Sequence, residues 1–137
     1  MRVYLAAPLF CEAEREFNRR VAGELRGAGF EVWVPQESLL VETGSREEKR
    51  AIFEADVGAL RGCDVVVAVL DGACVDCGVA FEIGYAAALG KPVVGLKTDH
   101  RVFSRVEEVN LVLEVAMRRV CESVGEVIEV LGEIGVV

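Results

Sequence analysis

The chain has 137 residues, 53% of them hydrophobic, which is enough for one domain with a well-filled core, and we expect residues 1–137 to form that single domain. Its 23 acidic and 15 basic side chains give a net charge of −8, which disfavours binding to a nucleic acid polymer. No apolar run approaches the roughly 18 residues that span a bilayer, and no secretory leader opens the chain, so we expect a cytoplasmic protein without a membrane partner.

The cysteines are odd in number and scattered, which predicts reduced thiols rather than a disulfide framework. Cys74 and Cys77 form a C-x-x-C pair, but a structural zinc site needs four ligands. The sequence has no second pair, and the only histidine, His100, lies far along the chain. We therefore expect no metal site. The remaining three cysteines are Cys11, Cys63 and Cys121.

The first half of the chain alternates between strand and helix. Arg2–Ala6 is an apolar strand, and Glu12–Gly27 has helical periodicity that ends in a glycine-rich breaker. Phe30–Val34 is a second strand, closed by proline. Ser45–Arg61 is then predicted as a helix, opened by a capping box between its first residue and Glu48.

The second half continues the alternation. Asp64–Leu70 is apolar on both faces, as expected for a strand at the centre of a parallel sheet. A helix at Cys77–Leu89 and a strand at Pro92–Leu96 follow. After a polar loop, we expect a helix, an optional short strand and a last helix at Val109–Met117, Arg119–Cys121 and Val124–Leu131.

This alternation predicts an α/β fold, namely a three-layer sandwich around a parallel sheet of four or five strands, flavodoxin-like or Rossmann-like, in the order 2-1-3-4-5. Ligands of such sheets bind at the carboxyl ends of the strands, where the strand order reverses. The loops at that point are Ala7–Cys11 and Asp71–Asp76. Neither loop has the glycines of a dinucleotide or triphosphate cradle, so no nicotinamide, ATP or other cofactor is expected.

Glu82 is the only charged side chain between residues 77 and 90. A helix that is apolar all round is expected to be buried, and an ionised carboxylate there costs several kcal/mol unless it is paired. Glu82 is therefore either a functional group or a carboxylate that reaches solvent or pairs with an arginine. Asp71 and Asp76, in the preceding loop, bring two more carboxylates to the switch point.

Three further side chains each have two interpretations. Asp76 directly precedes a helix and is an N-cap, a catalytic acid or both. Asp56 lies on or beside the buried face of its helix, unless it is a boundary residue that pairs with Arg50 or Arg61. Tyr4 is a core aromatic whose hydroxyl, near the carboxyl end of the first strand, can reach the same crevice.

Clustered carboxylates without metal-binding histidines fit glycosyl chemistry, in which one carboxylate attacks a sugar and another handles the proton of the leaving group. Five segments together resemble the nucleoside 2-deoxyribosyltransferase family from Arg2 to about Asn110. The most specific part is the D-x-G-x-x-x-E-I-G spacing. The segments are Tyr4–Phe10, Ala55–Val57, Cys63–Ala68, Asp76–Ala86 and Gly90–Val93.

The resemblance implies that Glu82 is a nucleophile that takes a deoxyribosyl group from one nucleoside and passes it to a second base, with overall retention of configuration. Tyr4 would orient Glu82. Asp56 and Asp76 would contact the nucleobase and handle its proton. The other substrate-binding residues expected from the matching motifs are Ala7, Phe10 and Gly78.

The resemblance further implies that Asn110 reaches across a subunit contact to the sugar 5′-hydroxyl. The active site would then be complete only in a homo-oligomer, a dimer or larger. The alternative for Asn110 is an ordinary helix N-cap.

Two rival functions remain. A related branch of the superfamily hydrolyses deoxynucleoside 5′-monophosphates, but Asp76, Asn110 and the apolar segment 8–10 occupy the places where that branch binds phosphate, and a carboxylate beside a phosphate is repulsive. The N-terminus of the first helix could still serve an anion. The other rival is a nucleoside or nucleotide binding module without turnover, in which Glu82 is neutral or salt-bridged.

Overall fold

The computed structural model describes residues 1–38 and 40–135. The strands are β1 (Arg2–Ala6), β2 (Glu31–Trp33), β3 (Val65–Val69), β4 (Val93–Leu96) and β5 (Arg119–Cys121). The helices are α1 (Glu12–Gly27), α2 (Arg46–Gly62), α3 (Cys77–Ala88), α4 (Leu111–Ala116) and α5 (Val124–Gly135), and a short 3₁₀ helix, η1 (Pro35–Glu37), follows β2. Within the described ranges, no helix is long and apolar enough to cross a membrane.

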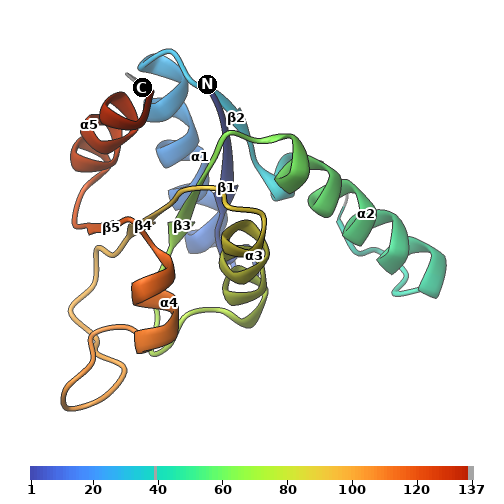
Figure 1. The fold of residues 1–137 in the computed structure, drawn as a ribbon. Helices are drawn as coiled ribbons and strands as arrows, with labels where there is room; N and C mark the ends of the chain where they lie inside the picture. The colour runs from blue at the N-terminus through green and yellow to red at the C-terminus, as the bar shows by residue number, and fades with distance from the viewer. Residues whose placement is uncertain (39, 136–137) are drawn as a thin grey trace.

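The strands form one parallel sheet in the order β2-β1-β3-β4-β5, with helices on both faces (Figure 1). The predicted α/β sandwich and its strand order are confirmed, and the optional fifth strand is present. Most boundaries differ from the prediction by no more than two residues, as helix and strand ends usually do. For example, α4 begins only after Asn110, which caps it. The larger difference is that α5 continues to Gly135, because Ile134 packs against the core.

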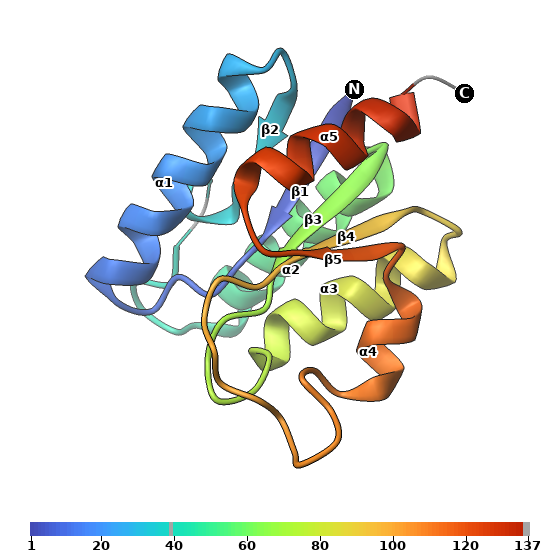
Figure 2. The ribbon, with the colours of Figure 1, turned by 90° about the vertical axis from the view of Figure 1, so that its left-hand side faces the viewer.

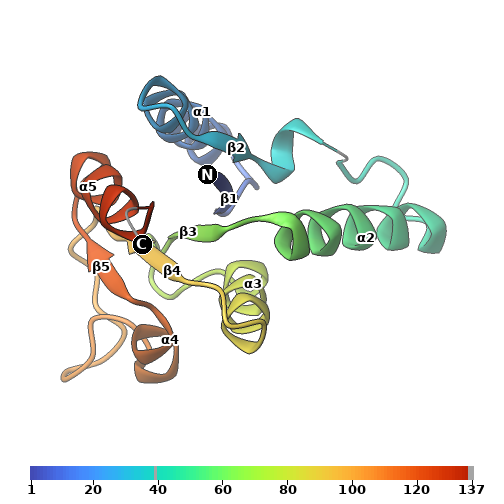
Figure 3. The same ribbon diagram turned by 45° about the horizontal axis from the view of Figure 1, so that its top comes forward.

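The side chains of β1 point alternately to the two faces of the sheet, and the hydrophobic core is divided in the same way. Val3 and Leu5 pack with α1 and α5 on one face of the sheet (Figure 2), whereas Tyr4 and Ala6 pack with α2 and α3 on the other (Figure 3). Successive side chains of a strand point to opposite faces, so this division follows from the backbone geometry. It brings Tyr4 to the face that carries α3 and therefore Glu82.

The expectation that α3 is buried on all sides is wrong. Val79, Ile83 and Ala86 are buried against the sheet, but the Phe81 side chain is 49% exposed and Gly84 is exposed. The sheet covers one side of the helix, and α2 and α4 lie beside it without closing over the outer face. In this chain, α3 therefore presents an apolar surface to solvent.

Helix α2 extends away from the body of the molecule (Figures 1 and 3). Its predicted cap is confirmed in part: the Ser45 hydroxyl accepts a hydrogen bond from the Glu48 amide. The Glu48 carboxylate, however, accepts from the amides of Thr43 and Gly44 rather than from that of Ser45. These bonds fold the segment before α2 onto the first turn of the helix.

Candidate active site

Tyr4 and Glu82 meet between the sheet and α3. Glu82 follows Val79 by three residues and precedes Ala86 by four, so it lies along the stripe of α3 that packs on the sheet. Tyr4 is fully buried in β1, and its hydroxyl donates a hydrogen bond to Oε2 of Glu82. This contact fixes one carboxylate oxygen of Glu82 and leaves Oε1 available.

The surroundings shift the ionisation of both groups. Burial raises the pKa of Glu82 to about 7; the hydrogen bond from Tyr4 opposes this rise, and the negative charges of Asp56 and Asp76 add to it. Burial, followed by the negative charge of Glu82, raises the pKa of Tyr4 far above its ordinary value. Tyr4 therefore remains a donor, while the Glu82 carboxylate titrates near neutral pH.

A cavity of about 210 Å³ opens beside Glu82. Its lining contains the three carboxylates predicted to be catalytic, and three of the four residues predicted to bind substrate; the fourth, Asn110, does not line it. The six residues are Glu82, Asp56, Asp76, Ala7, Phe10 and Gly78.

Asp76 sits at the start of α3 and its N-cap role is confirmed. Its Oδ2 accepts hydrogen bonds from the amides of Gly78 and Val79, at 3.0 and 3.2 Å. A Cβ atom at position 78 would lie 3.1 Å from that oxygen, so Gly78 allows the carboxylate to approach the helix closely. The cap fixes Asp76 at the rim of the cavity that Glu82 lines.

Asp56 enters the cavity from α2 and is partly buried, and burial raises its pKa. The alternative in which it pairs with an arginine is not observed: neither Arg50 nor Arg61 forms an ion pair with it in the described part of the chain. Arg61 instead donates to the Tyr85 hydroxyl at 2.7 Å. Asp56 thus holds a proton more readily than an ordinary aspartate.

The sequence interpretation missed part of the apolar wall of this cavity. Pro35 could have been anticipated, because β2 lies next to β1 and Pro35 follows the carboxyl end of β2. Nothing in the sequence pattern marked the others, which come from the loop before α2 and from its first turns. The four missed residues are Pro35, Leu40, Val41 and Ile52.

Tyr4 reaches Glu82 without lining the cavity, and Asp71 and Asn110 also lie outside its lining. The Asp71 carboxylate accepts hydrogen bonds from the amide and hydroxyl of Thr98 at 2.6 and 2.5 Å. Asn110 caps α4, and its Oδ1 accepts from the Val112 amide at 3.0 Å, as the N-cap alternative predicted. Within one chain, neither residue contributes to the cavity.

A larger cavity, of about 700 Å³, lies beside the loop after β4. Charged side chains of both signs line it, among them Lys97, Glu114 and Arg119, and none of the predicted site residues does. Size alone does not identify a site. In the Glu82 cavity three carboxyl groups converge, and burial raises the pKa of two of them, Glu82 and Asp56. No group of three or more histidine, cysteine or acidic side chains in the described ranges could hold a metal ion.

The Glu82 cavity combines one oriented carboxylate with two further carboxyl groups. Such a set can form a covalent bond to a sugar carbon and transfer a proton to the departing group without a metal.

Comparisons with known proteins agree with this chemistry. The sequence is 35% identical over 108 residues to the putative 2′-deoxynucleoside 5′-phosphate N-hydrolase 1 of Thermofilum pendens, covering 76% of this chain and 73% of the relative. A solved 2-deoxyribosyltransferase from Bacillus psychrosaccharolyticus superposes with a TM-score of 0.81 at 28% identity, over 93% of this chain and 90% of that one. A conserved protein from Enterococcus faecalis V583 gives the same TM-score at 29% identity, covering 94% and 95%.

A family model spans nearly the whole chain: residues 3–130 match the nucleoside 2-deoxyribosyltransferase family. The resemblance of the motifs to this family is thereby confirmed, as is the prediction of an enzyme of N-glycoside transfer or hydrolysis. The chain belongs to the nucleoside 2-deoxyribosyltransferase family.

Proposed function

We propose that this protein is a nucleoside 2-deoxyribosyltransferase in which Glu82 is the nucleophile. In the first step, Oε1 of Glu82 attacks the anomeric carbon, the bond from that carbon to the nucleobase nitrogen breaks, and the electron pair leaves with the base. The observation that carries this proposal is the Tyr4–Glu82 contact at a cavity that Asp56 and Asp76 also line. Tyr4 holds Oε2, so the attacking oxygen is presented in one orientation.

The departing base needs a proton, and we assign Asp56 as the donor because its pKa is raised. Its burial raises its pKa, so a larger fraction of it carries a proton than of an ordinary aspartate. Asp76 is held through Oδ2 by two amides, so its carboxyl group is fixed at the rim of the cavity, where it can contact the base.

In the second step, a nitrogen of an incoming base attacks the anomeric carbon and the ester bond to Glu82 breaks. The carboxylate of Glu82 is regenerated, and the proton of the incoming base passes to the carboxylate that supplied the first one. Each step inverts the anomeric configuration, so the product retains the configuration of the substrate.

The electrostatics of the cavity support a nucleoside rather than a 5′-monophosphate. Of the described residues that line it, three are acidic and none is Lys, Arg or His. At the N-terminus of α1, the one expected place for an anion, a carboxylate is already present: Oε1 of Glu14 accepts from the amides of Phe10 and Cys11, just before the helix, at 2.9 and 3.1 Å. A phosphate there would lie beside this negative charge.

The second candidate is hydrolysis of deoxynucleoside 5′-monophosphates, with water in place of the incoming base. The similarity to the Thermofilum pendens protein favours it, since that relative is named as a putative 5′-phosphate N-hydrolase. The acidic lining and the Glu14 carboxylate at the start of α1 weigh against it in this chain.

We also propose that the enzyme is a homo-oligomer whose subunit contact covers α2, α3 and α4. Phe53 of α2 and Phe81 of α3 are half exposed with ring centroids 6.1 Å apart, and on α4 Val112 and Val115 are 68% and 82% exposed. Monomers rarely leave so much apolar surface uncovered on neighbouring elements. Asn110 caps α4 on this surface. In the proposed oligomer, Asn110 of one copy would therefore lie beside Glu82 of another copy.

The remaining partners and the location follow from composition. A small nucleoside and a nucleobase are the proposed substrates, and the net charge of −8 argues against a nucleic acid polymer. All five cysteines are free thiols, which suits the cytoplasm that we propose as its location.

Two parallel incubations test the proposed function. The protein is mixed with a deoxynucleoside and a different free base, and separately with deoxynucleoside monophosphates, and the products are separated by chromatography. Exchanged nucleoside in the first mixture supports the transferase, whereas free base and deoxyribose phosphate from the second support the hydrolase. Silence in both mixtures would exclude either enzyme activity for the substrates tried.

A further inference from the structure

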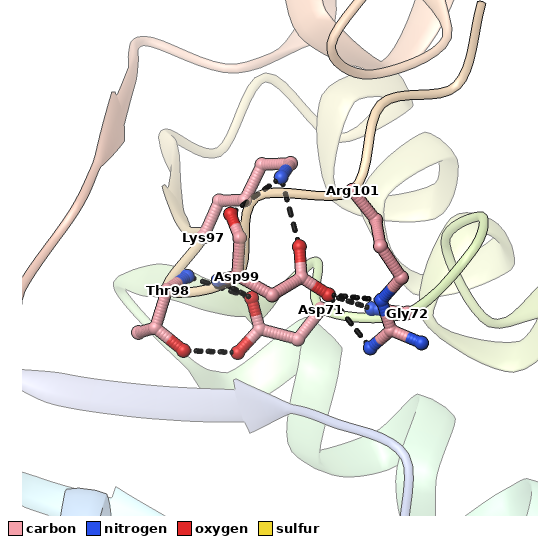
Figure 4. A network of polar contacts seen from close by, with 6 residues as sticks. All are labelled: Asp71, Gly72, Lys97, Thr98, Asp99 and Arg101. Atoms are coloured by element: carbon pink, nitrogen blue, oxygen red, sulfur yellow. Dashed lines mark hydrogen bonds and ion pairs between the residues drawn. The ribbon is translucent and has the colours of Figure 1, made fainter.

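A network of polar contacts joins the loop after β3 to the loop after β4 (Figure 4). Oδ2 of Asp99 accepts a hydrogen bond from the Gly72 amide at 2.8 Å. In the other direction, Oδ1 of Asp71 accepts from the amides of Thr98 and Asp99 at 2.6 and 3.1 Å. Each aspartate thus binds the backbone of the opposite loop, and the two loops are held together by reciprocal contacts.

Two cations bind the Asp99 carboxylate. Lys97 is 8% exposed, and its ammonium donates to Oδ1 of Asp99 at 2.9 Å and to the carbonyl of the same residue at 2.8 Å. Arg101 donates to Oδ2 of Asp99 at 2.8 Å. Partial burial opposes ionisation, but the hydrogen bonds from Lys97, Gly72 and Arg101 outweigh it and hold the pKa of Asp99 at about 2. Asp99 therefore stays charged throughout the neutral range.

The loop after β3 leads directly to Asp76. Only three residues lie between Gly72 and Asp76. Gly72 has φ of +131°, and a Cβ there would lie 3.0 Å from the Cys74 carbonyl oxygen, so this tight turn requires glycine. On its helical side Asp76 is fixed by the cap of α3, whereas on the other side the chain is anchored through Gly72 and Asp71 to Asp99 and Thr98.

We propose that Asp99, together with Asp71, is a positioning residue of the active site: the pair clamps the loop 71–76 and thereby sets the position of Asp76 relative to Glu82. Neither aspartate lines the Glu82 cavity, so the clamp acts through Asp76. Asp71, which was predicted among the acids of the switch point, thus acts by holding the opposite loop rather than by contacting substrate. The clamp deepens the proposed function and rests on it.

The test is a double-mutant cycle with base exchange as its readout. D99A is expected to lower kcat about 10- to 100-fold, because a misplacement of about 1 Å can cost that much. D71A, which leaves the pair between Lys97 and Asp99 in place, is expected to act in the same direction. When Asp76 is first replaced in D76N, the additional loss from D99A should shrink to about threefold or less, since residues that act through one another are not additive.

D64A is the matched control. Asp64 also binds a backbone amide and an arginine, both of Arg2, but at the opposite end of β3, and its removal should leave kcat unchanged. An unchanged kcat in D99A and D71A, or an equal loss from D99A with and without Asp76, would overturn the clamp.

Hydrogen exchange separates this inference from the proposed function. If the wild-type protein exchanges no base, the transferase proposal fails, but the clamp still predicts faster amide exchange over residues 72–79 in D99A and D71A than in D64A. Equal exchange rates in that segment would overturn the clamp whatever the activity. Melting temperatures of all variants identify any that do not fold. If D99A is one of them, the same measurements on D71A test the clamp.

Discussion

Tyr4 and Glu82 are 78 residues apart in the chain, yet the Tyr4 hydroxyl donates to Oε2 of Glu82 between the sheet and α3. Tyr4 remains protonated, because burial and the charge of Glu82 both raise its pKa. The hydrogen bond stabilises the ionised form of Glu82, whose pKa nevertheless rises to about 7 through burial. The pair therefore makes both activity and stability depend on pH near neutrality.

Replacing Glu82 by Gln should abolish transfer and increase stability in a pH-dependent way. The folded protein binds the Glu82 proton more tightly than the unfolded chain, where the pKa is about 4.5, so stability from this group is present below pH 4.5 and is lost as the pH rises toward 7. The free energy of unfolding of E82Q should match that of the wild type at pH 4 and exceed it by up to about 3 kcal/mol at pH 8. Urea titrations at several pH values measure this difference.

The activity of E82Q should fall by at least about a thousandfold, as expected for loss of a nucleophile. E129Q, on the opposite face of the sheet, is the control for both measurements, because Glu129 is exposed on α5. Retained activity together with a large loss of stability would instead mean that Glu82 is structural.

Y4F should shift the acid limb of the pH profile. Glu82 must be ionised to attack, so kcat/KM of the wild type should fall about tenfold per pH unit well below pH 7. Loss of the Tyr4 hydroxyl removes the contact that lowers the pKa of Glu82, so the limb should move to higher pH. A pH series of initial rates measures the shift; a limb at unchanged pH would show that Tyr4 does not act on Glu82.

Two substitutions of Asp76 distinguish its role as the N-cap of α3 from its proposed role in catalysis. Asn retains a capping oxygen, so D76N should keep the melting temperature while its kcat falls about 100-fold or more. D76A should lose a similar activity and, in addition, about 1 kcal/mol of stability through loss of the cap. If D76N is fully active, Asp76 serves as a cap alone. S45A, which removes the cap of α2, provides a comparison for the stability loss.

V115D tests whether the α4 surface is a subunit contact. Val115 is 82% exposed and outside the Glu82 cavity, so in a monomeric enzyme the substitution should change neither stability nor activity noticeably. In the proposed oligomer, a buried charge at the contact should reduce the molar mass measured by light scattering and should reduce activity with it. E129K, on the α5 face, is the matched surface control. A wild-type protein that is monomeric at assay concentration and fully active would refute the assembly.

Much of this protein can be read from local patterns in the sequence. Strand and helix periodicity is a property of neighbouring residues, so the strands and the α-helices were predictable, with errors at ends such as those of α4 and α5. Their alternation gave the strand order, whereas the short helix η1 was missed. Cap positions are equally local, and Asp76 and Asn110 are N-caps as their places before helices indicated.

Which of the carboxylates meet depends on packing between distant segments. Asp56, Asp76 and Glu82 share a cavity, whereas Asp71, five residues before Asp76, turns toward Thr98, because side-chain direction in a loop depends on contacts that sequence spacing does not encode. The exposed side of α3 is a second case: apart from Glu82 its composition is apolar all round, but the sheet can cover only one face of it. Local sequence patterns are therefore sufficient for the elements and for the chemical types at the switch point. That Tyr4 binds Glu82, and that Asp71 binds the loop that holds Asp99, follows only from the packing of segments far apart in the chain.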